Sequence, residues 1–276
     1  MKKNKYKILV LSDLKKATST TLKSTVGVSK MIDADIEFFH VRKPVGIVDN
    51  ENQINAFKTI NKEYIKTKKK IERLINPISE AYGVHIKHSF TFGNIKNEII
   101  KRIDEFKPDL IVLDRKKQKK FKLIGDNVTS YILNKYHGAV LIASDANTFE
   151  PNQELSLGIL KTNEEFLNLE FANDLIEHSQ KPLKSFKIIK NSSGILKTKE
   201  ASNDSQTIEY VFEENDNTIK SLSTYLSKNN INLLCLNREQ QPINDASNTV
   251  KTNLKEVVGN LNVSLLLTPK KKLKLQ

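Results

Sequence analysis

Short runs of apolar residues, each followed by a segment with helical periodicity, most constrain the fold of this chain. The runs are rich in Val, Ile and Leu and are four to seven residues long, which suits strands buried in a parallel sheet. The segments between them carry apolar residues three or four positions apart, the spacing of an amphipathic helix. Strands that alternate with helices predict an α/β protein with doubly wound parallel sheets and right-handed crossovers.

The expected elements follow the same order in both halves of the chain. The first half has expected strands at residues 7–12, 36–41, 85–90, 110–113 and 139–143, and expected helices at residues 18–32, 53–82, 94–106 and 127–136. The second half has expected strands at residues 155–160, 185–189, 206–212, 231–236 and 263–267, and expected helices at residues 164–178, 217–228 and 254–261.

This recurring order indicates an internal repeat. The fourth strands begin near residues 110 and 232 and the closing strands near 139 and 263, giving offsets of 122 and 124. Self-similarity at a nearly fixed offset is typical of repeated domains. The first strands are about 148 residues apart instead, so the second copy is shorter and lacks the long helix after its second strand. We therefore expect a first domain at residues 1–145, a linker at 146–154, a second domain at 155–269 and a basic tail at 270–276.

The formal net charge of +13 is concentrated in the first half. Residues 1–150 contain 29 Lys and Arg against 17 Asp and Glu, whereas residues 151–276 contain 16 against 15. The cations gather at residues 66–73 and 115–122. Such runs either attract anionic partners or are a solvated surface. Only Phe121 is interleaved with the second run, and no recognition helix is evident, so nucleic acid is not an expected partner.

Several classes of protein are excluded by what the sequence lacks. No apolar run approaches the roughly 20 residues of a membrane-spanning helix, and the first run is too short for a signal peptide. We expect a soluble, cytoplasmic protein with no membrane partner. Cys235 is the single cysteine, which excludes an intrachain disulfide and, inside an apolar strand, indicates a buried thiol. No ordering of Ser, His and Asp and no metal-ligand spacing stands out, so we expect no enzymatic activity and no metal.

The strand endings resemble those of the universal stress protein family in its tandem-domain form. The resemblance covers the first copy fully and the second more weakly. It is carried by the segments 7–13 (KILVLSD), 38–41 (FFHV), Gly93, 107–113 (KPDLIVL), 138–143 (GAVLIA) and 262–269 (NVSLLLTP). It implies two five-stranded domains of the adenine nucleotide alpha hydrolase-like type. In the family, closing strands pair across a dimer. Because apolar edge strands need a partner, we expect these two domains to pack as an intrachain pseudo-dimer.

The resemblance also implies where a nucleotide would lie. Family members that bind ATP carry G-x2-G-x9-G and then Ser or Thr after the fourth strand, where glycines let backbone amides approach phosphates. The first two glycine positions fall on Asp114 and Lys117, and the third falls near Gly125, Asp126 or Asn127. The base-side positions match Asp13, an acidic contact to the adenosine part, and Val41, whose backbone would lie near adenine. The candidate nucleotide-binding residues are Asp13, Val41, Lys117, Gly125 and Asn127.

Each of these residues also has a purely structural interpretation. Asp13 either contacts a ligand or caps the turn into the first helix. Asp126 and Asn127 either meet phosphates or cap the helix that they precede. The cations at 115–122 either replace the glycine cradle with point charges or form an exposed loop. In the second copy, the loop after Leu236 has no glycine.

We therefore expect a non-catalytic regulatory or interaction protein that does not use ATP in the family's usual way and needs no cofactor. The first alternative is a stress-response module that binds ATP or AMP in its first domain. A weaker alternative is a basic surface that docks on polyanions. The expected partner is another protein that the sequence does not identify, and further homodimerisation remains open.

Overall fold

The computed structural model describes residues 4–44, 53–115, 128–145, 148–161, 169–190, 207–238 and 254–269. The elements of the first half are β1 (Tyr6–Leu11), α1 (Thr18–Ile32), β2 (Ala34–Arg42), α2 (Gln53–Tyr82), β3 (Ile86–Phe92), α3 (Ile95–Phe106), β4 (Leu110–Asp114), α4 (Val128–Lys135) and β5 (Ala139–Ala143). Those of the second half are β6 (Leu157–Lys161), α5 (Ala172–Glu177), β7 (Leu183–Ile189), β8 (Thr207–Glu213), α6 (Thr218–Lys228), β9 (Leu233–Leu236), α7 (Leu254–Asn260) and β10 (Ser264–Leu267).

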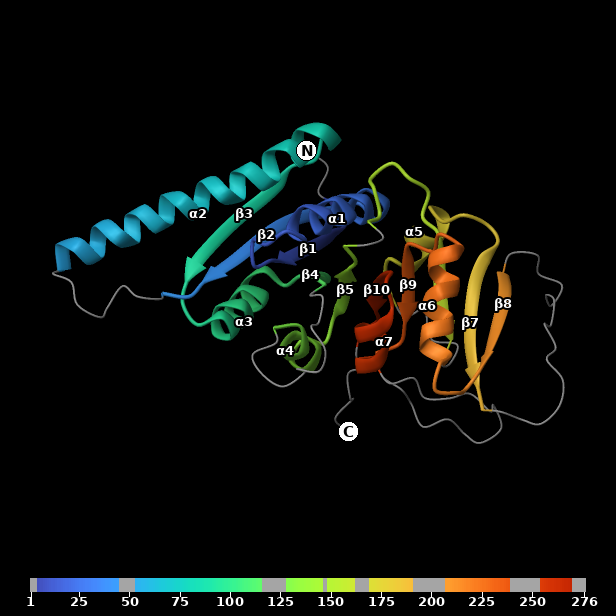
Figure 1. Cartoon of the computed structure of the whole chain (residues 1–276). Helices are drawn as coiled ribbons and strands as arrows, with labels where there is room; N and C mark the ends of the chain where they lie inside the picture. Colours follow the sequence, from blue (N-terminus) through green and yellow to red (C-terminus); the bar gives the residue numbers. More distant parts are fainter. Residues whose placement is uncertain are drawn as a thin grey trace, which may run out of the picture.

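All ten strands form one continuous sheet in the order β3-β2-β1-β4-β5-β10-β9-β6-β7-β8 (Figure 1). Each half contributes five strands in the same internal order, third-second-first-fourth-fifth, read inward from its free edge. The strands are parallel within each half, and only β5 and β10 meet antiparallel. This arrangement confirms the expected doubly wound fold and places the two halves as a pseudo-dimer within one chain.

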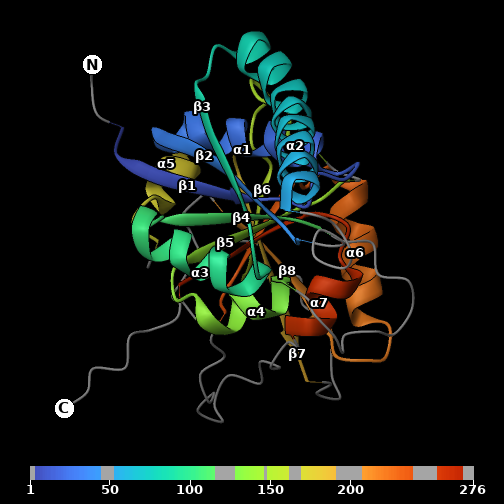
Figure 2. The same cartoon turned by 90° about the vertical axis from the view of Figure 1, so that its left-hand side faces the viewer.

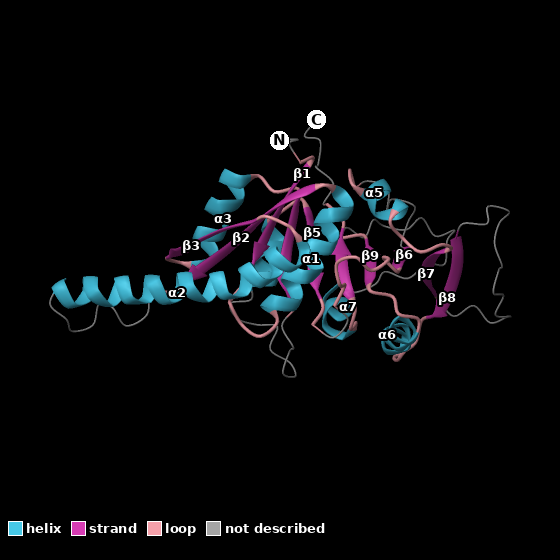
Figure 3. Ribbon diagram, turned by 90° about the horizontal axis from the view of Figure 1, so that it is seen from above, coloured by secondary structure: helices cyan, strands magenta, loops and turns pink. Residues whose placement is uncertain are grey.

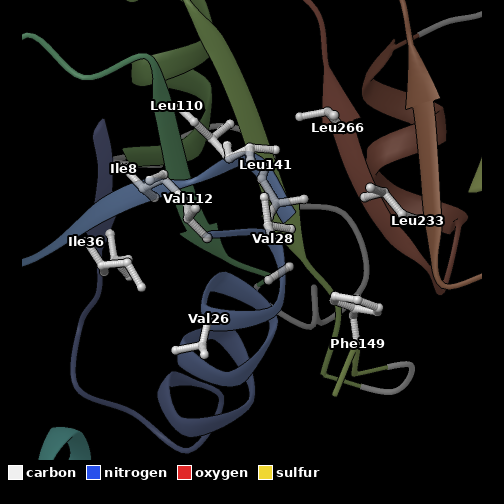
Figure 4. Packing of buried hydrophobic residues seen from close by; sticks show 14 of the residues in the cluster. Ile8, Val26, Val28, Ile36, Leu110, Val112, Leu141, Phe149, Leu233 and Leu266 are labelled. Atoms are coloured by element: carbon white, nitrogen blue, oxygen red, sulfur yellow. The ribbon is translucent and has the colours of Figure 1, made fainter. Parts of the chain in front are cut away.

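The two halves join through fully apolar strand edges. Leu141 of β5 lies opposite Leu266 of β10, and Ile142 lies opposite Leu265. All four side chains are buried, and Figure 4 shows Leu141 and Leu266 within the packed apolar cluster. Because a buried leucine contributes about 1.5–3 kcal/mol relative to an exposed one, neither closing strand would be stable as a free edge.

Helices cover both faces of the sheet (Figure 2). The apolar faces of α1, α2 and α5 share one core cluster, and those of α3, α4, α6 and α7 share the other. The long helix α2 has the bounds expected from its periodicity and continues through Pro77. Helix α5 is shorter than the expected segment 164–178, and residues 162–168 lie outside the described part of the chain. The segment 191–206, where the second copy is expected to lack a long helix, also lies outside it.

The segment between the halves packs closely on α1. Phe149 is buried against Gly27, where an added Cβ would lie 2.2 Å from the Phe149 ring. The Phe149 backbone N–H donates to Ser24 Oγ at 3.2 Å, and Glu150 accepts from Lys23 Nζ at 3.0 Å. Phe149 and Glu150, near the start of the described part of the expected linker (148–154), are therefore held against α1 of the first half.

Candidate functional site

The carboxyl ends of β1 and β4 meet at the switch point of the first half, where doubly wound sheets bind their ligands. The Ser12 hydroxyl donates to Asp114 Oδ2 at 2.7 Å and lies 2.6 Å from Thr18 Oγ1. Thr18 Oγ1 is itself 3.5 Å from Asp114 Oδ2. Three side chains from β1, β4 and the start of α1 thus form one polar network beneath the expected phosphate position.

Asp114 is the residue at the first glycine position of the motif, and its side chain is buried at 8% exposure. Burial raises the pKa of its carboxyl, an effect that the hydroxyls of Ser12, Thr21 and Thr18 partly oppose and the nearby charge of Asp13 reinforces. A carboxylate held here by hydroxyl donors adds negative charge where a phosphate would need positive potential.

Asp13 makes the contacts of a residue that caps the turn into the first helix. Its Oδ1 accepts the backbone N–H of Lys15 at 3.2 Å, and its Oδ2 lies 3.2 Å from Lys15 Nζ. An Asp that accepts the amide two residues later forms an Asx turn. The same residue also lines the pocket described next, so the turn and the pocket are compatible.

A pocket of about 130 Å³ opens at this end of the sheet. It brings together two of the predicted site residues, Asp13 and Val41, together with Asp114. Its apolar wall comes from β1, β2, β4, α3 and α4 through Leu11, Phe39, Ile95, Ile99, Leu113 and Val128. The pocket therefore has a mostly apolar lining with two acidic residues, Asp13 and Asp114, a composition that suits a largely apolar ligand held by a few polar contacts. The predicted residues Lys117, Gly125 and Asn127 lie outside the described residues.

His40 supports the pocket from below. Its ring Nδ1 lies 2.8 Å from the backbone oxygen of Ser12. Burial lowers the pKa of the imidazole, although the contact to Ser12 opposes this shift. The contact ties the end of β2 to the residue that follows β1.

Arg115, the first cation of the basic run, turns away from the pocket. Its guanidinium donates to the backbone oxygens of Val258 at 2.6 Å and Val263 at 3.0 Å, both in the second half. Burial lowers its pKa. For Arg115 the expectation of a phosphate-binding or loop role is therefore replaced by a structural one, while residues 116–122 lie outside the described residues.

The second half carries a different set of side chains at the corresponding place. Asn237 follows β9 as Asp114 ends β4, and its Oδ1 accepts from Thr268 Oγ1 at 3.1 Å. Arg238 occupies the position of Arg115 and donates to the oxygen of Gly138 at 3.0 Å. The Arg238 contact crosses the join between the halves, whereas the Asn237 contact lies within the second half. Arg238 was not predicted from the sequence. A usable signal was its place in the repeat, because Arg238 follows Asn237 after β9 as Arg115 follows Asp114 at the end of β4.

Other reactive groups are inert or scattered. Cys235 is fully buried, and burial raises its pKa. Among the described residues, no group of three His, Cys, Asp or Glu could hold a metal ion. No helix in the described part of the chain is long and apolar enough to span a membrane.

These features define a class: an α/β protein with a pocket at the switch point of a doubly wound sheet. The comparisons give its family. The sequence model of a protein family, described as the universal stress protein family, matches residues 6–144. The chain belongs to that family.

Solved structures support the fold of the whole chain. A universal stress protein from Archaeoglobus fulgidus DSM 4304 is 13% identical, with a TM-score of 0.63 and 97% coverage of each chain. A functionally unknown protein from Pseudomonas aeruginosa PAO1 is 11% identical, with a TM-score of 0.57, covering 96% of this chain and 92% of that one. The universal stress protein UspA from Lactobacillus plantarum, 16% identical with a TM-score of 0.41, covers 51% of this chain and 99% of its own. No curated protein matches.

Proposed function

We propose that this chain is a non-catalytic regulatory or interaction protein of the universal stress protein family that does not hold ATP in the family's usual way. The observation that carries this proposal is the Asp114 carboxylate. It stands where the resemblance expects the first glycine, and hydroxyls of Ser12 and Thr18 hold it in place. A phosphate at this edge would meet a fixed negative charge instead of backbone amides.

The position of Arg115 supports the same conclusion. A cation next to Asp114 could offset the carboxylate, but this guanidinium is engaged by carbonyls of the other half. The described residues also give no support for a catalytic site. Cys235 is buried, and no nucleophile, base and orienting group come together among the described residues. We propose that the function lies in binding and assembly.

A second candidate function is supported by the pocket. Asp13 and Val41, the two base-side positions, both line it, and its wall is apolar. In this alternative the first half binds an adenine nucleotide through its base and ribose, and the lysines of residues 116–122 meet the phosphates.

Calorimetric titration with ATP and AMP, together with mass spectrometry of the natively purified protein, separates the two candidates. The first proposal expects no carried-over nucleotide and no ATP binding below millimolar concentration. The Asp13→Ala variant is the matched control. Micromolar ATP binding that this variant abolishes would overturn the first proposal in favour of the second.

A further inference from the structure

Helix α2 carries a straight row of cations on its outer surface. Lys58, Lys62, Lys66, Lys69 and Arg73 are all exposed, and their spacing of three or four residues places them within an arc of about 80° at 3.6 residues per turn. The row is about 22 Å long at 1.5 Å per residue. Not every cation of α2 belongs to the row. The neighbouring Lys68 faces a different side of the helix, and its Nζ lies 3.9 Å from Glu72 Oε1.

No described acidic residue of α2 forms an ion pair with the row, although the exposed Glu80 lies on the same side of the helix about two turns beyond Arg73. Glu72 faces Lys68, and Glu63 pairs with Arg42 of β2. Among the described residues, none of the five cations of the row has an ion pair. Five aligned positive charges therefore face solvent and attract an anionic partner, with interactions screened only by salt.

The apolar side of α2 points elsewhere. Ile71 and Ile75 are buried against the sheet. Ile60 and Tyr64, at 39% and 47% exposure, continue that inward face, and the Tyr64 ring packs 4.7 Å from the Phe90 ring. A helix that binds a membrane surface needs an apolar face free to insert beside its cations. Here Ile71 and Ile75 are buried, and Ile65, at 47% exposure, is a single apolar side chain next to the row and not a continuous apolar face.

The first turns of α2 project beyond the ends of the neighbouring strands (Figures 1 and 3). This leaves the row accessible along the side of a straight rod. A straight row of fixed cations is complementary to the regularly spaced phosphates of a nucleic acid duplex, where each neutralised phosphate releases counterions. We propose that the α2 row docks on the phosphate backbone of double-stranded nucleic acid without reading its sequence.

This binding site shares no residue with the pocket or with the basic run at 115–122. It requires no base contact, which fits the lack of a recognition helix in the sequence. Under this proposal, the double-stranded nucleic acid is the anionic partner of the regulatory protein. Its binding to the α2 row does not depend on whether a nucleotide occupies the pocket.

The test is fluorescence anisotropy of a labelled 20-base-pair DNA duplex of arbitrary sequence, titrated with the full chain. With five phosphate contacts, the affinity should fall about 10²- to 10³-fold between 50 and 200 mM salt. A variant with all five row cations changed to Gln should bind at least about tenfold more weakly at 50 mM salt and show a much flatter salt dependence.

The matched control removes the same net charge from dispersed exposed positions, by changing Lys87, Lys135, Lys181, Lys220 and Lys228 to Gln. The control should keep most of the affinity and the salt slope. Equal weakening of both variants would show a net-charge effect and overturn the proposal. So would dependence on Lys116, Lys117, Lys119 and Lys120 instead of the row, or equal binding to phosphatidylserine vesicles or polyglutamate. All substituted side chains in the row are exposed, and an unchanged melting temperature verifies folding.

Discussion

Arg115 and Arg238 make the same contact in opposite directions across the join between the two halves. Arg115 donates to Val258 in α7 and to Val263, the residue before β10. Arg238 donates to Leu133 in α4 and to Gly138, the residue before β5. Each guanidinium thus donates to one carbonyl in the last turn of the opposite helix, where backbone oxygens have no partner within the helix, and to one carbonyl just before the opposite closing strand. The two arginines stabilise the pseudo-dimer reciprocally.

Arg115→Ala or Arg238→Ala should therefore lower the free energy of unfolding by about 1–3 kcal/mol, because each leaves part-buried carbonyls without donors. Urea denaturation followed by circular dichroism measures this change. Arg73→Ala on the exposed row is the matched control and should change stability by less than about 0.5 kcal/mol. If the three variants are equally stable, the reciprocal contacts contribute nothing to the join.

Leu141→Lys should break the pairing of β5 with β10. It places a charge opposite Leu266 in a dry interface, and burying an unpaired charge destabilises by about 4 kcal/mol or more. The exposed apolar edges should then cause aggregation, visible by light scattering after size-exclusion chromatography. Ile208→Lys, on edge strand β8 and already 41% exposed, is the control and should remain monodisperse. A well-behaved Leu141→Lys protein would mean that the join does not depend on this pairing.

The order and type of the strands could be predicted because their signal is local. Apolar runs such as 139–143 and the helical spacing within 53–82 are visible within single windows of sequence, and the structure confirms strands or a helix there. The pairing of β5 with β10 was also expected, because the family that the sequence resembles pairs its closing strands across a dimer and two apolar edges in one chain need cover.

The site was less predictable because its contacts are distant in sequence. The resemblance to the family singled out Asp13 and Val41, and the structure places both on the lining of one pocket, while their role in binding stays a prediction. The partners of Arg115 lie 143 and 148 residues away, so the cations that follow it in the sequence indicated the wrong role. The network of Ser12, Thr18 and Asp114 likewise spans about a hundred residues. The periodicity of apolar residues within a sequence window carries no information on contacts between residues so far apart.

The burial of Asp114 should make the protein's stability depend on pH. Burial raises the pKa of this carboxyl above that of an unfolded Asp, which is about 3.9. Between these two values the folded state binds more protons than the unfolded state, so stability falls as pH rises through that range. Asp114→Asn removes this term while keeping the side-chain shape. Its stability relative to the original protein should therefore increase as the pH is raised from about 4. Urea denaturation in half-unit pH steps measures it, and a pH-independent difference would contradict the assignment.

The same carboxylate should set the affinity for ATP. Asp114→Asn removes the charge, and Asp114→Gly removes both the charge and the side chain that keeps backbone amides from a phosphate. If Asp114 is what excludes phosphate, affinity for ATP should rise in the order Asp, Asn, Gly, by at least about tenfold overall, or about 1.4 kcal/mol. Adenosine, which lacks phosphates, is the control ligand and should change by less than about threefold. Calorimetric titration of the three proteins with both ligands measures this. Equal ATP affinity in all three would show that the pocket discriminates against phosphate by other means.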